Sequence, residues 1–166
     1  MKKNIVIVLS ILLISAVIVL LLFMNRTPTL ARVYVDPQTA EKAVGQNFVV
    51  NLNVSYVANL YAWQVKLAYD HTILKLVNTV QGDFLGASDL TFFTYKVNAT
   101  SDFILIDCTL LGNLSGVNGS GTLATIEFHV EQSGSCDLSL YDTQLIDPSE
   151  QIIEHSSNNG HFSSVS

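Results

Sequence analysis

The sequence predicts an all-β sandwich that follows one N-terminal transmembrane helix. From residue 47 onward, apolar and polar residues alternate in short segments with the period of two of a β-strand. Clusters of Gly, Asn, Ser, Asp and Pro separate these segments and are typical of turns. Since seven or more short strands at this spacing favour two packed sheets, the fold class is a β-sandwich.

The N-terminal segment is predicted to be a membrane anchor. Lys2 and Lys3 precede an uncharged apolar run over residues 5–24, about the ~20 residues that a helix needs to span a bilayer. Lysines before the run favour an N-terminus inside the cell and a domain outside it. The predicted division is an anchor over 1–25, a linker over 26–32 and the sandwich over 33–166. The alternative is a secreted protein with a cleaved signal peptide, for which Thr29-Leu30-Ala31 would be the cleavage motif.

The predicted strands follow one another along the whole outer domain. They cover residues 47–57, 61–70, 73–82, 90–98, 102–112, 122–130, 136–147 and a last segment near 160–165. In the first strand, Tyr56 is assigned to the buried face together with four apolar residues. The residues expected to form the core, because they share one phase of the alternation, are Phe48, Val50, Leu52, Trp63, Val65, Leu67, Ile104, Ile106, Ile126, Phe128, Leu138 and Leu140.

The strand "YAWQVKLAYD" over residues 61–70 supplies the candidate binding face. Its apolar face carries Trp63, the only tryptophan of the chain. Its other face is small, flat and nearly neutral, and it is formed by Ala62, Gln64, Lys66 and Ala68. Flat faces with few charges are where protein partners dock, although an ordinary exposed strand face has the same appearance.

The charge of the outer domain excludes some partners. All fourteen acidic residues and four of the eight basic residues follow residue 32, a formal net charge of −10. Such a domain repels nucleic acid and anionic lipid. Asn25 and four positions of the outer domain, Asn53, Asn98, Asn113 and Asn118, stand in Asn-x-Ser/Thr triplets, which are N-glycan acceptors in exported domains.

No motif of catalysis or metal binding is recognisable. His71, His129, His155 and His161 lack the spacing of metal ligands, no Gly-x-Ser-x-Gly occurs, and no EF-hand pattern accompanies the acidic loops. The chain is therefore predicted to be a binding module without a cofactor rather than an enzyme. Carbohydrate binding is the alternative function, with Phe92, Tyr95 and Tyr141 as the candidate aromatic side chains.

The two cysteines are predicted to remain unpaired. If strands 102–112 and 122–130 form a hairpin, Cys108 lies about 13 Å from the connecting loop and Cys136 about 30 Å from it. A disulfide requires Cα atoms within about 7 Å. Both residues fall on the apolar phase of their strands, so the expectation is two separate buried thiols.

The order of these motifs resembles the cohesin domain family. The parallel segments are "VGQNFVVNLNV", "LYAWQVKLAYDHTILKLV", "QGDFLG", "GSGTLATIEFHV" and "CDLSLYDTQLID" with the closing "NNGHFSSV". The resemblance covers most of residues 33–166. It implies a jelly-roll β-sandwich of about nine strands from a prokaryotic surface or scaffold protein, with a fold similar to cellulose-binding modules.

The resemblance also implies non-catalytic adhesion through a protein partner at the cell surface. Cohesins of cellulosomes hold dockerins, two-helix calcium-loop modules that carry polysaccharide-degrading enzymes. In the enzyme-binding cohesins, that contact involves an Asn-x-Asp on the outward face of the strand that ends in Tyr-Asp. The matching positions here are Ala62 and Gln64, so the carboxylate is replaced by an amide. A dockerin-like partner would have to be recognised differently, and polysaccharide remains the alternative ligand.

Overall fold

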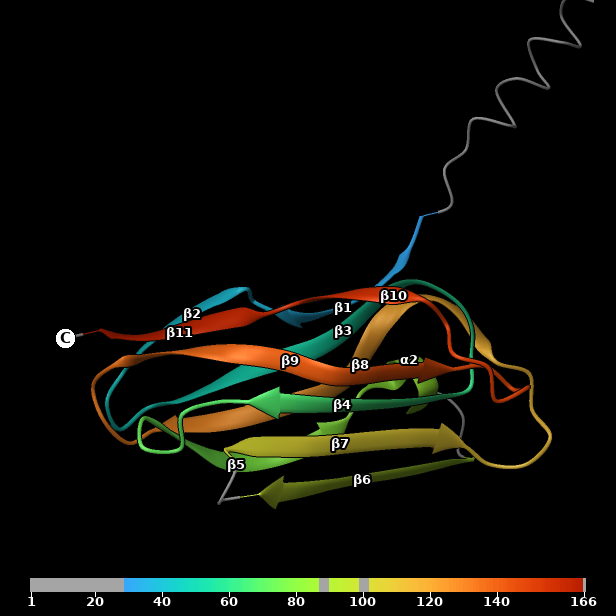
Figure 1. The fold of residues 1–166 in the computed structure, drawn as a ribbon. Helices are drawn as coiled ribbons and strands as arrows, with labels where there is room; N and C mark the ends of the chain where they lie inside the picture. The colour runs from blue at the N-terminus through green and yellow to red at the C-terminus, as the bar shows by residue number, and fades with distance from the viewer. Residues whose placement is uncertain (1–28, 87–89, 99–101, 166) are drawn as a thin grey trace, which may run out of the picture.

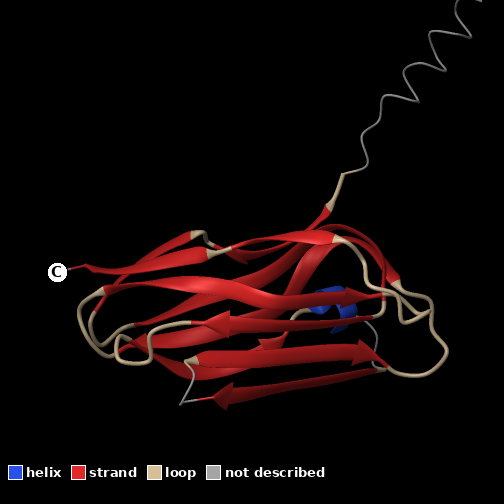
Figure 2. Cartoon of the chain, in the orientation of Figure 1, coloured by secondary structure: helices blue, strands red, loops and turns tan. Residues whose placement is uncertain are grey.

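The computed structural model describes residues 29–86, 90–98 and 102–165, which fold into two packed β-sheets (Figures 1 and 2). The predicted anchor over residues 5–24 lies outside these ranges. Within them, no helix is both long and apolar enough to cross a bilayer. The described elements are β1 (Ala31–Asp36), β2 (Thr39–Ala43), β3 (Asn47–Leu60), β4 (Ala62–Ala68), β5 (Leu74–Gln81), α2 (Asp83–Gly86), β6 (Thr91–Asn98), β7 (Phe103–Leu110), β8 (Val117–Val130), β9 (Ser135–Ile146), β10 (His155–Asn158) and β11 (Gly160–Val165).

The two sheets have five and six strands. The five-stranded sheet has the order β10-β1-β3-β8-β5, and the six-stranded sheet has the order β2-β11-β9-β4-β7-β6. β1 pairs with β10 in parallel and β2 with β11 in parallel, and the other pairs are antiparallel. In Figure 1, β9, β4, β7 and β6 lie side by side in front of β3 and β8. β4 therefore lies inside its sheet, with a neighbour on each side.

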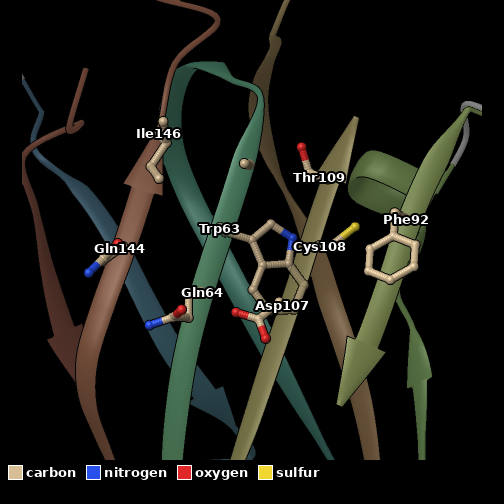
Figure 3. A pocket seen from close by; sticks show the side chains of 9 residues that line it. Trp63, Gln64, Phe92, Asp107, Cys108, Thr109, Gln144 and Ile146 are labelled. Atoms are coloured by element: carbon tan, nitrogen blue, oxygen red, sulfur yellow. The ribbon is translucent and has the colours of Figure 1, made fainter. Parts of the chain in front are cut away.

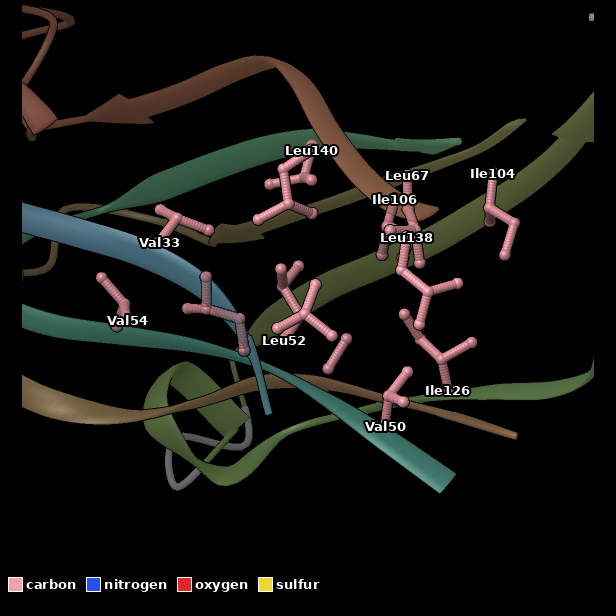
Figure 4. Close-up of a cluster of buried hydrophobic side chains, with 14 of the residues drawn as sticks. Val33, Val50, Leu52, Val54, Leu67, Ile104, Ile106, Ile126, Leu138 and Leu140 are labelled. Carbon is pink, nitrogen blue, oxygen red and sulfur yellow. The ribbon is translucent and has the colours of Figure 1, made fainter. Parts of the chain in front are cut away.

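The space between the sheets is filled by the residues that the alternation predicted (Figure 4). All twelve residues of the predicted core are buried, and none exposes more than 6% of its surface. Phe48 stacks on Phe162 with the ring centroids 4.8 Å apart and lies 5.8 Å from Phe128. The common phase of the strands thus produces one continuous core, as expected for a sandwich.

Tyr56 is an exception to the predicted phase. It is 62% exposed, whereas Ser55 and Val57 on either side of it are buried. The pairing of β3 with β8 shifts register between Val54 and Val57, and Tyr56 has a φ of 57°. A β-bulge inserts one extra residue and reverses the phase that follows, so the assignment of Tyr56 to the core was wrong.

The predicted hairpin of residues 102–112 and 122–130 is also wrong. β7 pairs with β4 and β6 in one sheet, whereas β8 pairs with β3 and β5 in the other. The connection between β7 and β8 therefore crosses from sheet to sheet. Cys108 and Cys136 are nevertheless unpaired, as predicted. Cys108 is buried, and Cys136 is only half-buried at the margin of the core.

Candidate functional site

The four candidate residues of the binding face lie together on the outer side of the six-stranded sheet. Ala62, Gln64, Lys66 and Ala68 alternate along β4 with buried residues, and each of the four is half-buried. Their partial burial comes from the neighbouring strands β9 and β7, which flank β4 on both sides. The strand phase read from the sequence therefore places these side chains correctly.

The pairing of β9, β4, β7 and β6 extends this strip into a surface four residues wide, here named the four-strand face. Residues directly opposite each other on paired antiparallel strands point to the same side of the sheet. The four-strand face consists of one row with Ile146, Ala62, Thr109 and Phe92, a second with Gln144, Gln64, Asp107 and Thr94, a third with Tyr141, Lys66, Leu105 and Lys96, and a fourth with Ser139, Ala68, Phe103 and Asn98.

Lys66 is held within this face by neighbouring residues. Its Nζ donates a hydrogen bond to Asp142 Oδ2 over 2.6 Å. It also lies 5.6 Å from the ring centroid of Phe103 and 5.9 Å from that of Tyr141, and the two rings meet edge to face. The hydrogen bond with Asp142 raises the pKa of Lys66 above its usual value. The charge of Lys66 is therefore balanced in place.

A bulge in β9 orients Asp142, the residue that pairs with Lys66. The pairing of β9 with β4 shifts register between Gln64 and Lys66, and Asp142 has a φ of 49°. The extra residue turns the Asp142 carboxylate toward β4. The alternation in "CDLSLYDTQLID" does not indicate such a bulge, and sequence analysis missed this residue.

The first two rows of the four-strand face enclose a shallow hollow of about 190 Å³ (Figure 3). Gln64, Gln144 and Asp107 lie along one side of it, on three adjacent strands. The rest of the lining is formed by Ala62, Trp63, Phe92, Cys108, Thr109 and Ile146. Phe92 is 57% exposed and belongs to the edge strand β6. The hollow thus combines apolar walls with two amides and one carboxylate.

Asp107 was not predicted as a site residue. It lies directly opposite Gln64 across the β4–β7 pair, on the second row. Burial raises the pKa of Asp107, and the nearby Lys96 partly counteracts this effect. The alternation of "FILID" indicates that this carboxylate points outward, but the sequence does not tell which strand lies beside β7.

The three aromatic residues named for sugar binding do not form one platform. Phe92 is in the first row on β6 and Tyr141 in the third row on β9, with two strands between them. Tyr95 lies opposite the buried Ile106 and so belongs to the other side of the sheet. Sugar rings stack best on neighbouring coplanar aromatic faces, an arrangement that these three residues do not provide.

The Asn-x-Ser/Thr triplets occupy different environments. Asn113 is exposed in the loop between β7 and β8. Asn53 is half-buried within β3, and its Oδ1 is buried. The Oδ1 of Asn118 accepts a hydrogen bond of 2.9 Å from the backbone N–H of Asn59. Asn98 ends β6, and the rest of its triplet lies outside the described residues, as does Asn25.

Solved structures with the same fold include several cohesins. The non-cellulosomal cohesin of the hyperthermophilic archaeon Archaeoglobus fulgidus is 21% identical, with a TM-score of 0.70 over 83% of this chain and 93% of that one. A type I cohesin of Clostridium thermocellum, solved as the Coh-OlpA–Doc918 cohesin–dockerin complex, is 14% identical with a TM-score of 0.70 over 82% of this chain and 100% of that one. A type II cohesin from the cellulosome of Acetivibrio cellulolyticus is 16% identical, with a TM-score of 0.68 over 82% and 95% of the two chains.

The sequence itself matches a family model. A search of curated proteins finds no significant match. The model of the cohesin domain, in contrast, matches residues 33–163, which is most of the chain and nearly all of the sandwich. The resemblance seen in the motifs is thereby confirmed, and the chain belongs to the cohesin domain family.

Proposed function

We propose that this domain is a non-catalytic docking module that binds a protein partner through the four-strand face. The observation that carries the proposal is the balanced charge of this face, where Lys66 and Lys96 offset Asp107 and Asp142, within a domain of net charge −10. Lys66 is neutralised by Asp142, and the remaining residues of β4 on this face are small or carry an amide. Interface cores are depleted in charge, because unpaired charges are costly to bury.

The solved relatives support a protein partner. The Clostridium thermocellum cohesin of similar fold was solved as a complex with a dockerin. Here Ala62 and Gln64 occupy the positions of the Asn-x-Asp that the family uses for dockerin contact. A dockerin-like partner of this chain would therefore meet an amide where the enzyme-binding cohesins present a carboxylate, and its own contact residues would have to differ.

The location at the cell surface is part of the same proposal. The apolar run over residues 5–24, with Lys2 and Lys3 before it, supports a membrane anchor with the domain outside the cytoplasm. In a glycosylating host, Asn113 is the acceptor that we expect to be modified first, because its loop is exposed whereas Asn53 is half-buried within a strand. Mass spectrometry of glycopeptides from the exported protein would test this order.

The test of the docking function is a titration against the partner. A protein captured from surface extracts by the full chain would be titrated calorimetrically with the wild type and with Gln64→Glu. Gln64→Glu should weaken binding by ~1–3 kcal/mol, because a carboxylate cannot donate the hydrogen bonds of the amide and leaves an acceptor of the partner unpaired in a desolvated contact. Gln132→Glu, the same change at an exposed turn, serves as the control and should bind like the wild type. Equal affinities for Gln64→Glu and wild type would remove this face from the mechanism.

A further inference from the structure

On the four-strand face, Lys66 has a partner of opposite charge, whereas Asp107 has none. Lys66 is paired with Asp142 at 2.6 Å and flanked by two aromatic rings. The side-chain carboxylate of Asp107, in the middle of the second row, makes neither a hydrogen bond nor an ion pair with any residue of the described part of the chain. Lys96, one row away on β6, affects it only through its field.

An unpaired carboxylate of this kind is costly to the free domain. Asp107 is half-buried, with Gln64 on one side and Thr94 on the other. Burying a charge disfavours folding unless a partner of opposite charge or a hydrogen-bond donor compensates it. Within the described residues only the field of Lys96 offsets part of this cost, and no side chain bonds to the carboxylate. A binding partner that covers the face therefore has to supply the missing donor or cation.

The hollow beside Asp107 indicates which kind of partner side chain would lie next to the cation that binds Asp107. Its apolar walls include Ile146, Ala62 and Phe92, and its volume is about 190 Å³. Such a space suits one branched or aromatic side chain. Ala62 keeps it open, because a larger residue at this central position of the first row would fill it.

This inference rests on the proposed docking function and specifies the partner. We propose that Asp107 anchors a cationic side chain of the protein partner and that the hollow receives an adjacent apolar side chain. An arginine suits the anchor best, because its planar guanidinium can donate two hydrogen bonds to one carboxylate. The net charge of −10 would in addition attract a basic surface toward the domain.

A dipeptide tests this anchor without knowledge of the partner. The full chain, kept in solution in a maltoside detergent and labelled with ¹⁵N, would be titrated at low salt with N-acetyl-Leu-Arg-amide. N-acetyl-Leu-citrulline-amide, which has nearly the same shape and no charge, is the matched control probe. We expect the amide signals around Asp107, Thr109 and Phe92 to shift, and the arginine peptide to bind about three- to fivefold more tightly, the upper range for a partly exposed ion pair.

Three variants determine whether Asp107 is responsible. The preference for arginine should vanish in Asp107→Asn, which preserves shape, and persist in Glu41→Gln, which removes an exposed carboxylate from β2. Ala62→Leu should weaken both peptides by filling the hollow. Thermal unfolding of each variant checks that it is folded. Equal binding of the two peptides to the wild type, or an unchanged preference in Asp107→Asn, would overturn the inference. If the captured protein still loses affinity with Gln64→Glu in that case, the docking function stands and only the anchor is wrong.

Discussion

Trp63 shows what a single side chain contributes to this domain. It is 2% exposed, and its indole lies 6.4 Å from the ring of Phe93 on β6. It also forms part of the lining of the hollow under the four-strand face, so it links the core to the site. Replacing it would remove core volume and leave the outer face without support.

Trp63→Ala should therefore lower the free energy of unfolding by ~3–5 kcal/mol, through lost apolar transfer and the cavity left behind. Phe92→Ala is the control, because Phe92 is 57% exposed and its truncation should change stability little. Urea denaturation of both variants measures the difference. Similar stabilities for wild type and Trp63→Ala would contradict the position of Trp63 in the core.

Asp107 gives the site a predicted pH dependence. Since burial raises its pKa, the folded chain holds this proton more tightly than the unfolded chain. The free energy of unfolding therefore falls as the pH rises from the ordinary pKa of an aspartate, which applies to the unfolded chain, through the raised pKa of the folded chain. Asp107→Asn should unfold at a higher temperature than wild type at about pH 7, and the difference should shrink at about pH 3, where both states are protonated. Calorimetric melting at the two pH values measures the difference in unfolding temperature. If the wild type is more stable than Asp107→Asn at neutral pH, the carboxylate is compensated in the free domain and this prediction is wrong.

At the scale of elements, alternation located the strands but not their irregularities. β4 and β7 follow the period of two from end to end, and every one of their side chains points as the sequence predicts. β3 and β9 each carry a bulge, and the alternation does not predict either one. In β3 it places Tyr56 wrongly in the core, and in β9 it does not identify Asp142 as the partner of Lys66. A bulge depends on the pairing strand, which a single segment does not reveal.

Three strands were not recognised in the sequence at all. β1 has a clear alternation, with Ala31, Val33 and Val35 buried, and it was overlooked because its start falls in the segment assigned to the linker. β2 and β10 are edge strands of five and four residues. Short polar edge strands bury few side chains and so leave almost no hydrophobic pattern.

Gly82 marks the point where the chain leaves the five-stranded sheet. It follows β5, donates its N–H to Leu123 O over 2.9 Å, and precedes α2. A Cβ at this position would overlap the backbone carbonyl of Thr122 on β8. Since the backbone has little room to yield, Gly82 is required by close approach rather than by conformation.

Gly82→Ala should thus destabilise the domain by about 3 kcal/mol, the upper range for overpacking. Gly45→Ala is the comparison, because Gly45 has a φ of 83° and open space around it. That variant should cost only about 1 kcal/mol of left-handed strain. Denaturant unfolding of both proteins measures the ranking, and a Gly82→Ala variant as stable as Gly45→Ala would contradict the close packing of β5 and β8.

For the whole molecule, the sequence predicted the fold class and the core but not the sheet to which each strand belongs. Sequential strands usually pair, which predicts a hairpin of β7 and β8, yet the two strands lie in different sheets. The missing strand pairing also left the predicted binding face incomplete. Ala62, Gln64, Lys66 and Ala68 were found from one strand, whereas Asp107, Gln144 and Ile146 join them only through pairing that local patterns do not specify.

The proposed topology of the anchored chain makes a prediction in cells. If residues 5–24 span the membrane with the domain outside, protease added to intact cells should remove the sandwich and leave the anchor behind. Antibodies against each part, used on blots before and after lysis, would follow both fragments. A sandwich protected in intact cells and degraded only after lysis would show the opposite orientation.

The most direct test of the docking function is methyl cross-saturation between the captured partner and the full chain with labelled Ala, Ile, Leu and Val methyl groups. The predicted result is strong loss of signal for Ala62 and Ile146 in the first row of the four-strand face, Leu105 in the third and Ala68 in the fourth. Val49, Val77 and Val80, exposed on strands of the five-stranded sheet, should keep their signals. Saturation of those valines with the four-strand face unaffected would contradict the account.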